Sequence, residues 1–364
     1  MTQRDIIIEH FRAQIGWCEA LGSPFTAQLI TVLHQNIVDG GMLDDMLRDW
    51  RGEPTMDALS LRVAGALQAL VRAGKTPDLA ALYPDVQRPV TADDLRAPVL
   101  AALADHRAAI SEFLTYAVQT NEVGRSSVLL PGFAHLARQF DLPFSLYEMG
   151  ASAGLNMIWD QFHYDFGNGH LWGDPDSPVH FDVKWEGPFP ALPPSFKIAR
   201  RQAVDINPLD IHNGPSVDRV RSYIWPDQTA RITRFEGAIA LAKQAGIQVE
   251  QGDAGDWVAA HLTDPQPGRL RVLYHSIMWQ YPPEETRQRI INTMRQAGDA
   301  ATPDAPLGWM NLEPLDATAT LPTLNVRLWD GRDHDGTLYQ LAHCHPHGGH
   351  LVWFDEPKTD TVSS

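Results

Sequence analysis

The residues with the greatest chemical potential lie in one short stretch, residues 146–156, which reads LYEMGASAGLN. An apolar run ends at Glu148, and a turn of small residues containing Gly150 and Gly154 follows it. Glycine lets a ligand approach the backbone closely because it has no side chain. The run after the turn is typical of a helix, whose N-terminus offers unpaired N–H groups and a positive dipole end. The stretch therefore predicts a ligand-binding turn, with Glu148 placed to accept hydrogen bonds from a ribose-like diol.

The spacing E-x-G-x-x-x-G favours a turn that binds a nucleotide or S-adenosylmethionine. In that interpretation the small residues Gly150, Ala151 and Gly154 lie next to the ligand. The cofactor expected at this turn is S-adenosylmethionine, and Ser152 and Asn156 belong to the residues expected to bind it.

The same turn also matches G-x-S-x-G, in which Ser152 would be the nucleophile of an α/β hydrolase. His347 would then be the base, with Asp316 or Asp330 orienting it, in the chain order that this fold uses. Glu148 has no role in such a hydrolase, and no His-Gly-Gly loop precedes the turn. The hydrolase stays an alternative.

A second acid closes a strand predicted over residues 198–206. Asp205 ends that strand, at the place where Rossmann-like sheets carry a ribose-binding carboxylate. Asn207 follows it in the same predicted cofactor site, and Asp210 is a rival for the carboxylate role. The interval from the glycine turn is longer than the usual ~20 residues, and an insertion accounts for the excess.

A third acid, Asp253, follows a short strand that ends near Gln251. Asp253 would bind an adenine amino group, with the Ala254 N–H facing the ring. The alternative is that Asp253 or Asp256 caps the helix that follows.

The next predicted strand, residues 271–275, ends in His275, with Trp279 and Gln280 just beyond. Its run Val-Leu-Tyr is apolar, as expected of a strand buried on both faces. Ligands bind at the carboxyl ends of strands in open α/β sheets. His275 is therefore a candidate general base, and Trp279 and Gln280 are candidate substrate-binding residues.

A polar loop, residues 119–127, lies between two predicted helices just before the central turn. One interpretation is a helix end, a loop and an N-cap. The other is a loop over the ligand turn, in which Glu122 and Arg125 touch the substrate and act in catalysis, and Gln119 and Asn121 help to bind it.

Four histidines and one cysteine lie between residues 343 and 350. Pro346 and the pair of glycines that follow indicate a turn, and no acidic ligand lies at suitable spacing. We therefore expect a hairpin turn with incidental histidines and no metal site.

Hydrophobic spacing predicts helices from about residue 5 to residue 116 and alternating strands and helices beyond residue 126. We expect a helical N-terminal subdomain (1–125) and a sheet domain (126–364) with a β-hairpin insertion near 164–194. Further strands are expected near 326–329, 337–341 and 351–354, and the sheet is expected to end in an antiparallel pair.

Composition and charge argue against a nucleic-acid-binding protein and against a membrane-spanning protein. The chain has 364 residues, two cysteines and a formal charge of −16. The acidity argues against a nucleic-acid partner, because phosphate binding uses clustered Lys and Arg. No apolar run approaches the ~18 residues of a membrane span. We expect a cytoplasmic protein that acts on a small molecule, and a homodimer stays open.

The order of these elements resembles the class I S-adenosylmethionine-dependent methyltransferase fold over residues 126–355. The predicted fold class is α/β, a Rossmann-like sheet with helices on both faces. The resemblance implies that Glu148 and Asp205 bind the ribose, the small residues of the turn accept the methionine part, and Asp253 with Ala254 binds adenine. The family has a glycine at the position of Ser152.

A second resemblance covers nearly the whole chain. The segments QTNEVGRS (119–126), GASAGLN (150–156), DINPLD (205–210), WPDQ (225–228) and PHG (346–348), with His275 and Trp279-Gln280-Tyr281, are similar to the bacterial domain-of-unknown-function 2332 family. That family brings no established activity. The expected function is methyl transfer to a small-molecule acceptor; the alternatives are a serine hydrolase or a non-catalytic ligand-binding protein of the same fold.

Overall fold

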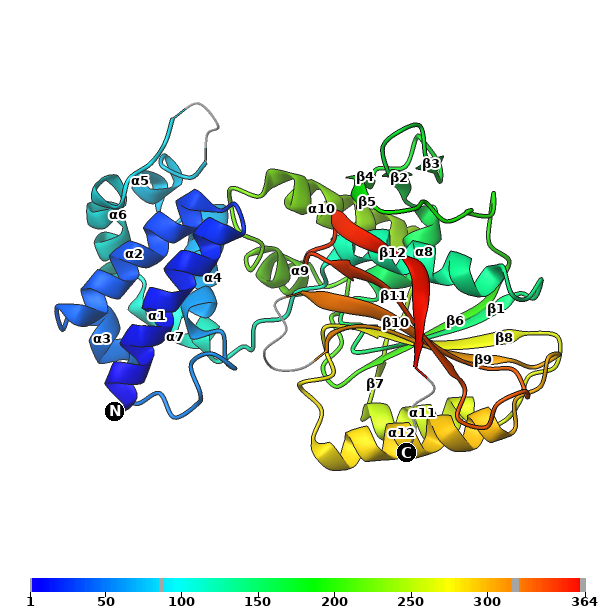
Figure 1. Ribbon diagram of the computed structural model, residues 1–364. Coiled ribbons are helices and arrows are strands. Elements are labelled where there is room, and N and C mark those ends of the chain that lie inside the picture. Colours follow the sequence, from blue (N-terminus) through cyan, green and yellow to red (C-terminus); the bar gives the residue numbers. More distant parts are fainter. Residues whose placement is uncertain (1, 85–87, 316–320, 361–364) are drawn as a thin grey trace. The chain divides into compact units, whose positions relative to one another are not determined.

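A computed structural model describes residues 2–84, 88–315 and 321–360 (Figure 1). The chain forms two compact units, one from residues 1–120 and 213–232 and the other from residues 121–212 and 233–364. The first is helical and the second contains a large sheet with helices, so the predicted mixed α/β fold with an N-terminal helical region is confirmed.

The helical unit is built from short helices whose ends carry clear signals. Thr2 caps the first helix and Thr91 caps the sixth, each in a reciprocal pair with the third residue of its helix. The helices of this unit are α1 (Gln3–Ala20), α2 (Pro24–Val38), α3 (Met42–Leu47), α4 (Leu59–Arg72), α5 (Pro77–Ala80), α6 (Ala92–Asp105), α7 (Arg107–Leu114) and α9 (Gly214–Arg221).

The segment 213–232 completes the helical unit although it lies a hundred residues downstream. Trp225 is buried in the core that Phe11, Leu33 and Leu67 share. The carboxylate of Asp227 accepts hydrogen bonds at the start of α2, from the Phe25 N–H at 2.9 Å and from neighbouring hydroxyls. Two stretches that are distant in sequence therefore form one core.

The sheet unit contains a nine-stranded sheet in the order β5-β12-β11-β10-β9-β8-β1-β6-β7. Its strands are β1 (Phe144–Met149), β5 (Lys184–Glu186), β6 (Ile198–Asp205), β7 (Glu250–Gln251), β8 (Leu270–Ser276), β9 (Leu307–Pro314), β10 (Pro322–Trp329), β11 (Thr337–Cys344) and β12 (His350–Asp360). Strands β7, β6, β1, β8 and β9 are parallel, and β10, β11 and β12 continue as an antiparallel meander.

Helices cover both faces of the parallel strands. The helices of this unit are η1 (Val123–Arg125), α8 (Ser126–Ala137), η2 (Leu155–Gln161), α11 (Ala254–Leu262) and α12 (Glu284–Asp299), with α10 (Thr229–Gln244) beginning in the helical unit. Leu273 packs in a core that α11 and α12 share, whereas the next residue, Tyr274, contacts Phe133 of α8. Alternating side chains thus face opposite helices, and Figure 1 shows α11 and α12 together on one face.

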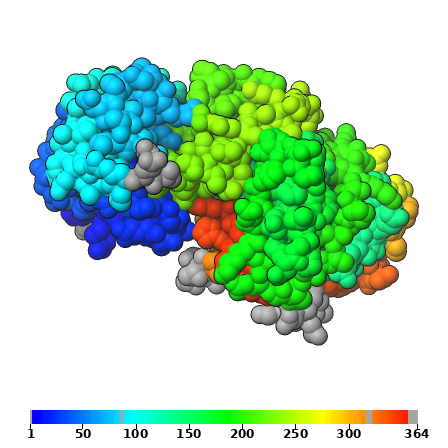
Figure 2. Space-filling view, turned by 90° about the horizontal axis from the view of Figure 1, so that it is seen from above, coloured from blue at the N-terminus to red at the C-terminus, as the bar shows by residue number. Residues whose placement is uncertain are grey.

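The segment after η2 forms a small sheet of its own. β2 (His163–Asp165) pairs antiparallel with β3 (Leu171–Trp172) and parallel with β4 (His180–Asp182), while β5 joins the edge of the large sheet. The predicted insertion is therefore more than a hairpin. In the view from above, bright green residues that include this segment form a continuous part of the surface (Figure 2).

Candidate functional site

The carboxyl ends of the parallel strands bring four side chains to one edge of the sheet. Glu148 lies at the end of β1, Asp205 at the end of β6, His275 near the end of β8 and Glu313 near the end of β9. These strands are consecutive neighbours in the order β6-β1-β8-β9. Glu148, Asp205 and His275 are site candidates from the sequence, and the structure adds Glu313 to them.

The turn after β1 is held by Asp205. Its Oδ2 accepts a hydrogen bond from the Ser152 N–H at 2.8 Å, and its Oδ1 accepts one from the Asn207 N–H at 2.8 Å. Ala151 is buried, and its N–H donates to the Val204 carbonyl at 3.2 Å. The carboxylate at the tip of β6 therefore fixes the backbone of the glycine turn on β1.

The two glycines of the turn both have positive φ, 67° at Gly150 and 71° at Gly154. A Cβ on Gly150 would lie 2.9 Å from Cγ of Met278, and one on Gly154 would lie 2.7 Å from Cγ2 of Ile247. Glycine is therefore required by backbone conformation and by packing against the chain's own side chains. Ser152 also has positive φ, 53°, and its buried Oγ has no hydrogen-bond partner among the described residues.

The turn leads into η2, so the short helix expected after the turn is present, as a 3-10 helix with a break at Ile158. Asn156 is buried in this helix. Its Oδ1 accepts from the Ser126 hydroxyl at 2.7 Å, and its Nδ2 donates to the Glu122 carbonyl at 3.3 Å. A single irregular turn of this kind carries a weaker dipole than a long α-helix.

Glu148 is only 3% exposed. Its Oε2 accepts a hydrogen bond from the Tyr274 hydroxyl at 3.2 Å. Burial raises the pKa of the Glu148 carboxyl to about 8, and the charge of Asp205 adds to that effect, while Tyr274 and Arg125 oppose it. The carboxyl is therefore largely protonated at neutral pH.

The polar loop before α8 is built into the interior. The Asn121 Oδ1 accepts from the Leu155 N–H at 2.9 Å, and the Glu122 Oε1 accepts from the Gly124 N–H at 3.0 Å. Both side chains are buried. Asn121 thus supports the start of η2. Gln119, the other predicted substrate-binding residue of this loop, belongs to the helical unit.

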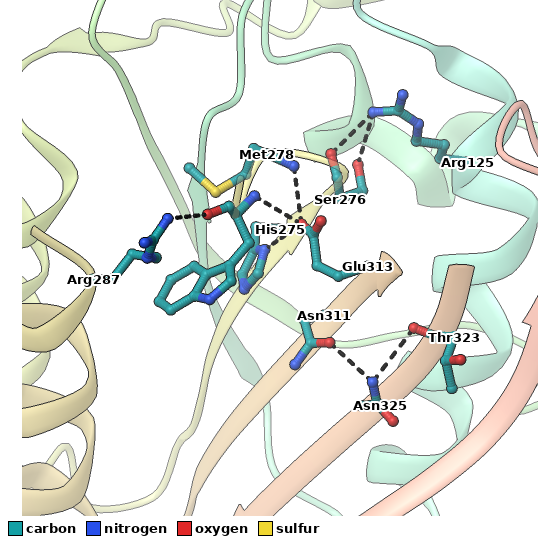
Figure 3. A network of polar contacts seen from close by, with 10 residues as sticks. Arg125, His275, Ser276, Met278, Arg287, Asn311, Glu313, Thr323 and Asn325 are labelled. Carbon is teal, nitrogen blue, oxygen red and sulfur yellow. Dashed lines mark hydrogen bonds and ion pairs between the residues drawn. The ribbon is translucent and has the colours of Figure 1, made fainter. Parts of the chain in front are cut away.

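Arg125 joins the loop to two other segments of the sheet unit. Its Nη1 donates to the Ser276 carbonyl at 2.9 Å, and its Nε donates to the Pro346 carbonyl at 3.2 Å. Figure 3 shows the guanidinium above the end of β8. Arg125 therefore holds the exit of β8 against the turn between β11 and β12.

Glu313 organises the exit of β8. Its Oε1 accepts hydrogen bonds from His275 Nδ1 at 2.8 Å, from the Met278 N–H at 2.9 Å and from the Trp279 N–H at 3.3 Å (Figure 3). Acceptance from Nδ1 places the imidazole proton on that nitrogen, so Nε2 is bare. Ile277, inside the same turn, has φ 48°, a strained conformation for a β-branched residue. The carboxylate thus stabilises a strained turn and orients the histidine.

Aromatic rings surround His275. The Trp279 ring stacks on the imidazole with centroids 5.2 Å apart, and the Trp309 ring lies 6.2 Å away. Trp279 is half-buried and Gln280 is exposed. His275 is 2% exposed, and its Nε2 has no hydrogen-bond partner among the described residues.

Asp253 is the N-cap of α11. Its Oδ1 accepts from the Asp256 N–H at 3.1 Å, its Oδ2 accepts from the Thr286 hydroxyl at 2.9 Å, and Arg289 lies 3.4 Å from Oδ1. Ala254 is the first residue of that helix. The Asp253 carboxylate thus already has protein partners on both oxygens.

The residues considered for a hydrolase form no nucleophile–base hydrogen bond in the described structure, because Ser152 Oγ has no partner there. His347 lies in the turn between β11 and β12, and Asp330 accepts from the Arg332 N–H. Asp316 lies outside the described residues.

The histidine-rich segment is a hairpin turn between β11 and β12, as expected. Within residues 2–84, 88–315 and 321–360, no group of three or more His, Cys, Asp and Glu side chains is placed to hold a metal ion. In the same ranges, no helix has the length and apolar character that crossing a membrane requires.

The family match covers residues 8–353, most of the chain, and its description is "Uncharacterized protein conserved in bacteria (DUF2332)". The chain belongs to the DUF2332 family. The resemblance noted in the polar loop, the glycine turn and the segment after β8 is therefore confirmed for the DUF2332 family. No curated protein matches the chain.

Proposed function

We propose that the protein transfers a methyl group from S-adenosylmethionine to a small-molecule acceptor at the carboxyl edge of β6, β1, β8 and β9. The observation that carries this proposal is Asp205, whose carboxylate lies at the strand tip next to a turn of left-handed glycines. The parallel strands have the order third, second, first, fourth, fifth. In open sheets with this order, ligands bind outside the carboxyl ends where the order reverses, here between β1 and β8.

The residues fit the cofactor at its ribose end. Asp205 offers carboxylate oxygens at the strand tip, and the buried Ser152 Oγ has no partner within the described chain. The Asn207 N–H donates to the same carboxylate, and Glu148, near the end of β1, accepts a hydrogen bond from the Tyr274 hydroxyl. A ligand at Gly150 would have to displace Met278, whose Cγ, Cβ and Cε lie 2.9, 3.0 and 3.1 Å from a Cβ built on that glycine.

At the adenine end the Ala254 N–H would face the ring, because the Asp253 carboxylate already caps α11. Bound S-adenosylmethionine supplies an electrophilic methyl group on a sulfonium, and methyl transfer needs mainly correct positioning of donor and acceptor. Trp279, whose ring stacks on His275, would line the acceptor side of the site. Asn121, Glu122 and Arg125 act as positioning residues through their contacts with η2 and β8.

Calorimetric titration with S-adenosylmethionine and S-adenosylhomocysteine tests this proposal. Asp205→Asn should weaken binding at least about tenfold, since hydrogen bonds to charged groups contribute roughly 1.5–3 kcal/mol. Glu148→Ala should weaken it as well. Asp210→Asn tests the rival for the ribose role: Asp210 is exposed and, among the described residues, accepts from the His212 N–H, and we expect this variant to keep wild-type binding.

Absence of binding by the wild-type protein to either compound would sink the methyltransferase proposal. The serine hydrolase is the second candidate, because Ser152 combines positive φ with a buried hydroxyl that lacks a partner in the described structure. A fluorophosphonate probe distinguishes the two: labelling that Ser152→Ala abolishes would favour the hydrolase, and a methyltransferase would show no such labelling.

A further inference from the structure

Three buried polar atoms without hydrogen-bond partners among the described residues lie on neighbouring strands. They are Nε2 of His275 on β8, Nε1 of Trp309 on β9 and Oδ1 of Asn325 on β10. Buried polar atoms in folded proteins nearly always have a partner, so each exception calls for an explanation. Three exceptions on adjacent strands point to one shared cause.

The strand register places these side chains on one face of the sheet. His275 is paired with Asn311, and Asn311 is paired with Asn325, with no irregularity in either ladder. Trp309 is two residues before Asn311, so both point to the same face. The contacts agree: Asn325 Nδ2 donates to Asn311 Oδ1 at 3.1 Å, and Trp309 lies beside the His275 ring. Figure 3 shows Asn311 on β9, the strand that also carries Glu313, and Asn325 on the neighbouring β10.

The protein partners fix what each free atom can do. Glu313 accepts a hydrogen bond from the protonated Nδ1 of His275, so the other ring nitrogen, Nε2, can accept a hydrogen bond or a proton. Trp309 Nε1 can only donate, and Asn325 Oδ1, as an amide oxygen, can only accept; the Nδ2 of the same amide donates to Asn311. A ligand in this place would therefore offer a donor to His275 Nε2.

We propose that this polar row, His275, Trp309, Asn311 and Asn325, is the site of the methyl acceptor, and that the acceptor is a small hydroxyl compound. This inference rests on the proposed methyl transfer. The hydroxyl oxygen gives its proton to His275 Nε2 and bonds to the methyl carbon, while the carbon–sulfur bond breaks and its electron pair stays on sulfur. The imidazolium that forms is stabilised by the Glu313 carboxylate.

A hydroxyl is the class of acceptor that uses this arrangement. A carboxylate that orients an imidazole whose second nitrogen is bare is the geometry of a general base. Tertiary amines and thioethers carry no proton on the reacting atom, so they would leave His275 without a role. Because Trp279 stacks on the imidazole, its half-buried ring must move aside for the acceptor to enter.

Glu313 is the positioning residue of this site. Its Oε1 holds the imidazole and the backbone of Met278 and Trp279 at once. In Glu313→Gln the side chain keeps its size but loses the charge that favours a proton on Nδ1. Long-range nitrogen–proton NMR of histidine-labelled protein reads the tautomer directly. We expect wild-type His275 to carry its proton on Nδ1, and this preference to weaken in Glu313→Gln.

Transfer of a tritiated methyl group to a panel of compounds tests the acceptor class. Phenol, catechol and benzyl alcohol are the hydroxyl acceptors, and N,N-dimethylaniline and thioanisole are matched compounds without a transferable proton. His275→Asn and Glu313→Gln should each lower transfer to the hydroxyl compounds at least about 100-fold, the lower end of general-base contributions. Binding of S-adenosylhomocysteine should stay within about twofold, and exposed His334→Asn is the control.

The outcomes separate this inference from the proposed function. If the wild-type protein does not bind S-adenosylhomocysteine, methyl transfer fails, and the inferred acceptor fails with it whatever the NMR shows. If it binds but no hydroxyl compound is methylated, or His275→Asn keeps its rate, the acceptor inference alone is overturned. A proton found on Nε2 of wild-type His275 would overturn the role of Glu313 independently of any cofactor.

Discussion

At the scale of single residues, the protonation of Glu148 has a measurable consequence for stability. The folded state raises the pKa of this carboxyl from 4.5 to about 8, chiefly by burial. Between these two values the unfolded chain releases the proton while the folded chain keeps it. Stability therefore falls as pH rises through this window, by at most about 1.4 kcal/mol per pH unit from this group.

Glu148→Gln should remove this dependence, because glutamine keeps a hydrogen-bonding side chain of the same shape without the titration. Urea unfolding at pH 6 and pH 8 measures the difference. We expect the free energy of unfolding of Glu148→Gln to increase relative to that of the wild-type protein as pH rises. Glu19→Gln, at an exposed position of α1, is the control. Equal slopes for the wild-type and Glu148→Gln proteins would contradict the raised pKa.

The strand-tip residues Glu148, Asp205 and His275 were predictable because each follows an apolar run that ends in a polar residue. Glu313 carries the same signal near the end of β9. Asn325 lies in a buried strand, where an amide is unusual. What the sequence does not contain is the register, and only the pairing of Asn311 with His275 on one side and with Asn325 on the other brings these side chains together.

At the scale of elements, the turn between β11 and β12 is fitted closely against η1. Gly348 has φ 71°, and a Cβ there would lie 2.0 Å from the Gly124 carbonyl oxygen. A Cβ on Gly124 would in turn lie 2.0 Å from the His347 carbonyl oxygen. Two backbones thus meet directly, and Arg125 donates to the Pro346 carbonyl beside them.

Gly348→Ala should be strongly destabilising, because it adds a clash of about 1–3 kcal/mol to the cost of a left-handed alanine, roughly 1–2 kcal/mol. Gly349→Ala is the matched control, since Gly349 has φ 76° but open space around its Cβ position. Thermal melting compares them. Similar melting temperatures for the two variants would show that the close contact contributes nothing.

Most elements were predictable from hydrophobic periodicity, including the helices near the N-terminus and the alternation from β1 to β9. The short helix expected after the glycine turn is present as η2, and its 3-10 form could not be predicted from the sequence. Tertiary contacts stabilise this helix, because Asn156 forms hydrogen bonds with the Ser126 hydroxyl and with the Glu122 carbonyl. A short apolar run does not reveal such contacts, and β3 and β5 are likewise too short to show a pattern.

At the scale of the whole molecule, the helical unit depends on a segment that the chain adds late. Asp227 accepts a hydrogen bond from the Phe25 N–H and contacts the hydroxyls of Ser23 and Thr26 at the start of α2. Asp227→Ala leaves these groups without their acceptor, which should cost about 1–3 kcal/mol. Hydrogen exchange followed by mass spectrometry should show loss of protection in α2 and its neighbours.

Asp218→Ala is the control for this prediction. Asp218 lies in the same segment, but its side chain is 67% exposed and forms a surface ion pair with Arg72. Such pairs contribute at most about 1 kcal/mol. If both variants lost protection equally, or if the loss lay in the sheet unit, the assignment of Asp227 to the helical core would be wrong.

The divided helical unit also sets an order of events on the ribosome. The helices up to residue 120 leave the exit tunnel first, yet Trp225 and Asp227 emerge only after β1 and β6 have been made. For that interval the nascent chain carries an unfinished helical core together with a β1–β6 pair whose outer edges still await β8 and β7. Exposed apolar surface and open strand edges are the features that favour aggregation during synthesis. The middle of translation is thus the stage at which this chain most needs protection by chaperones.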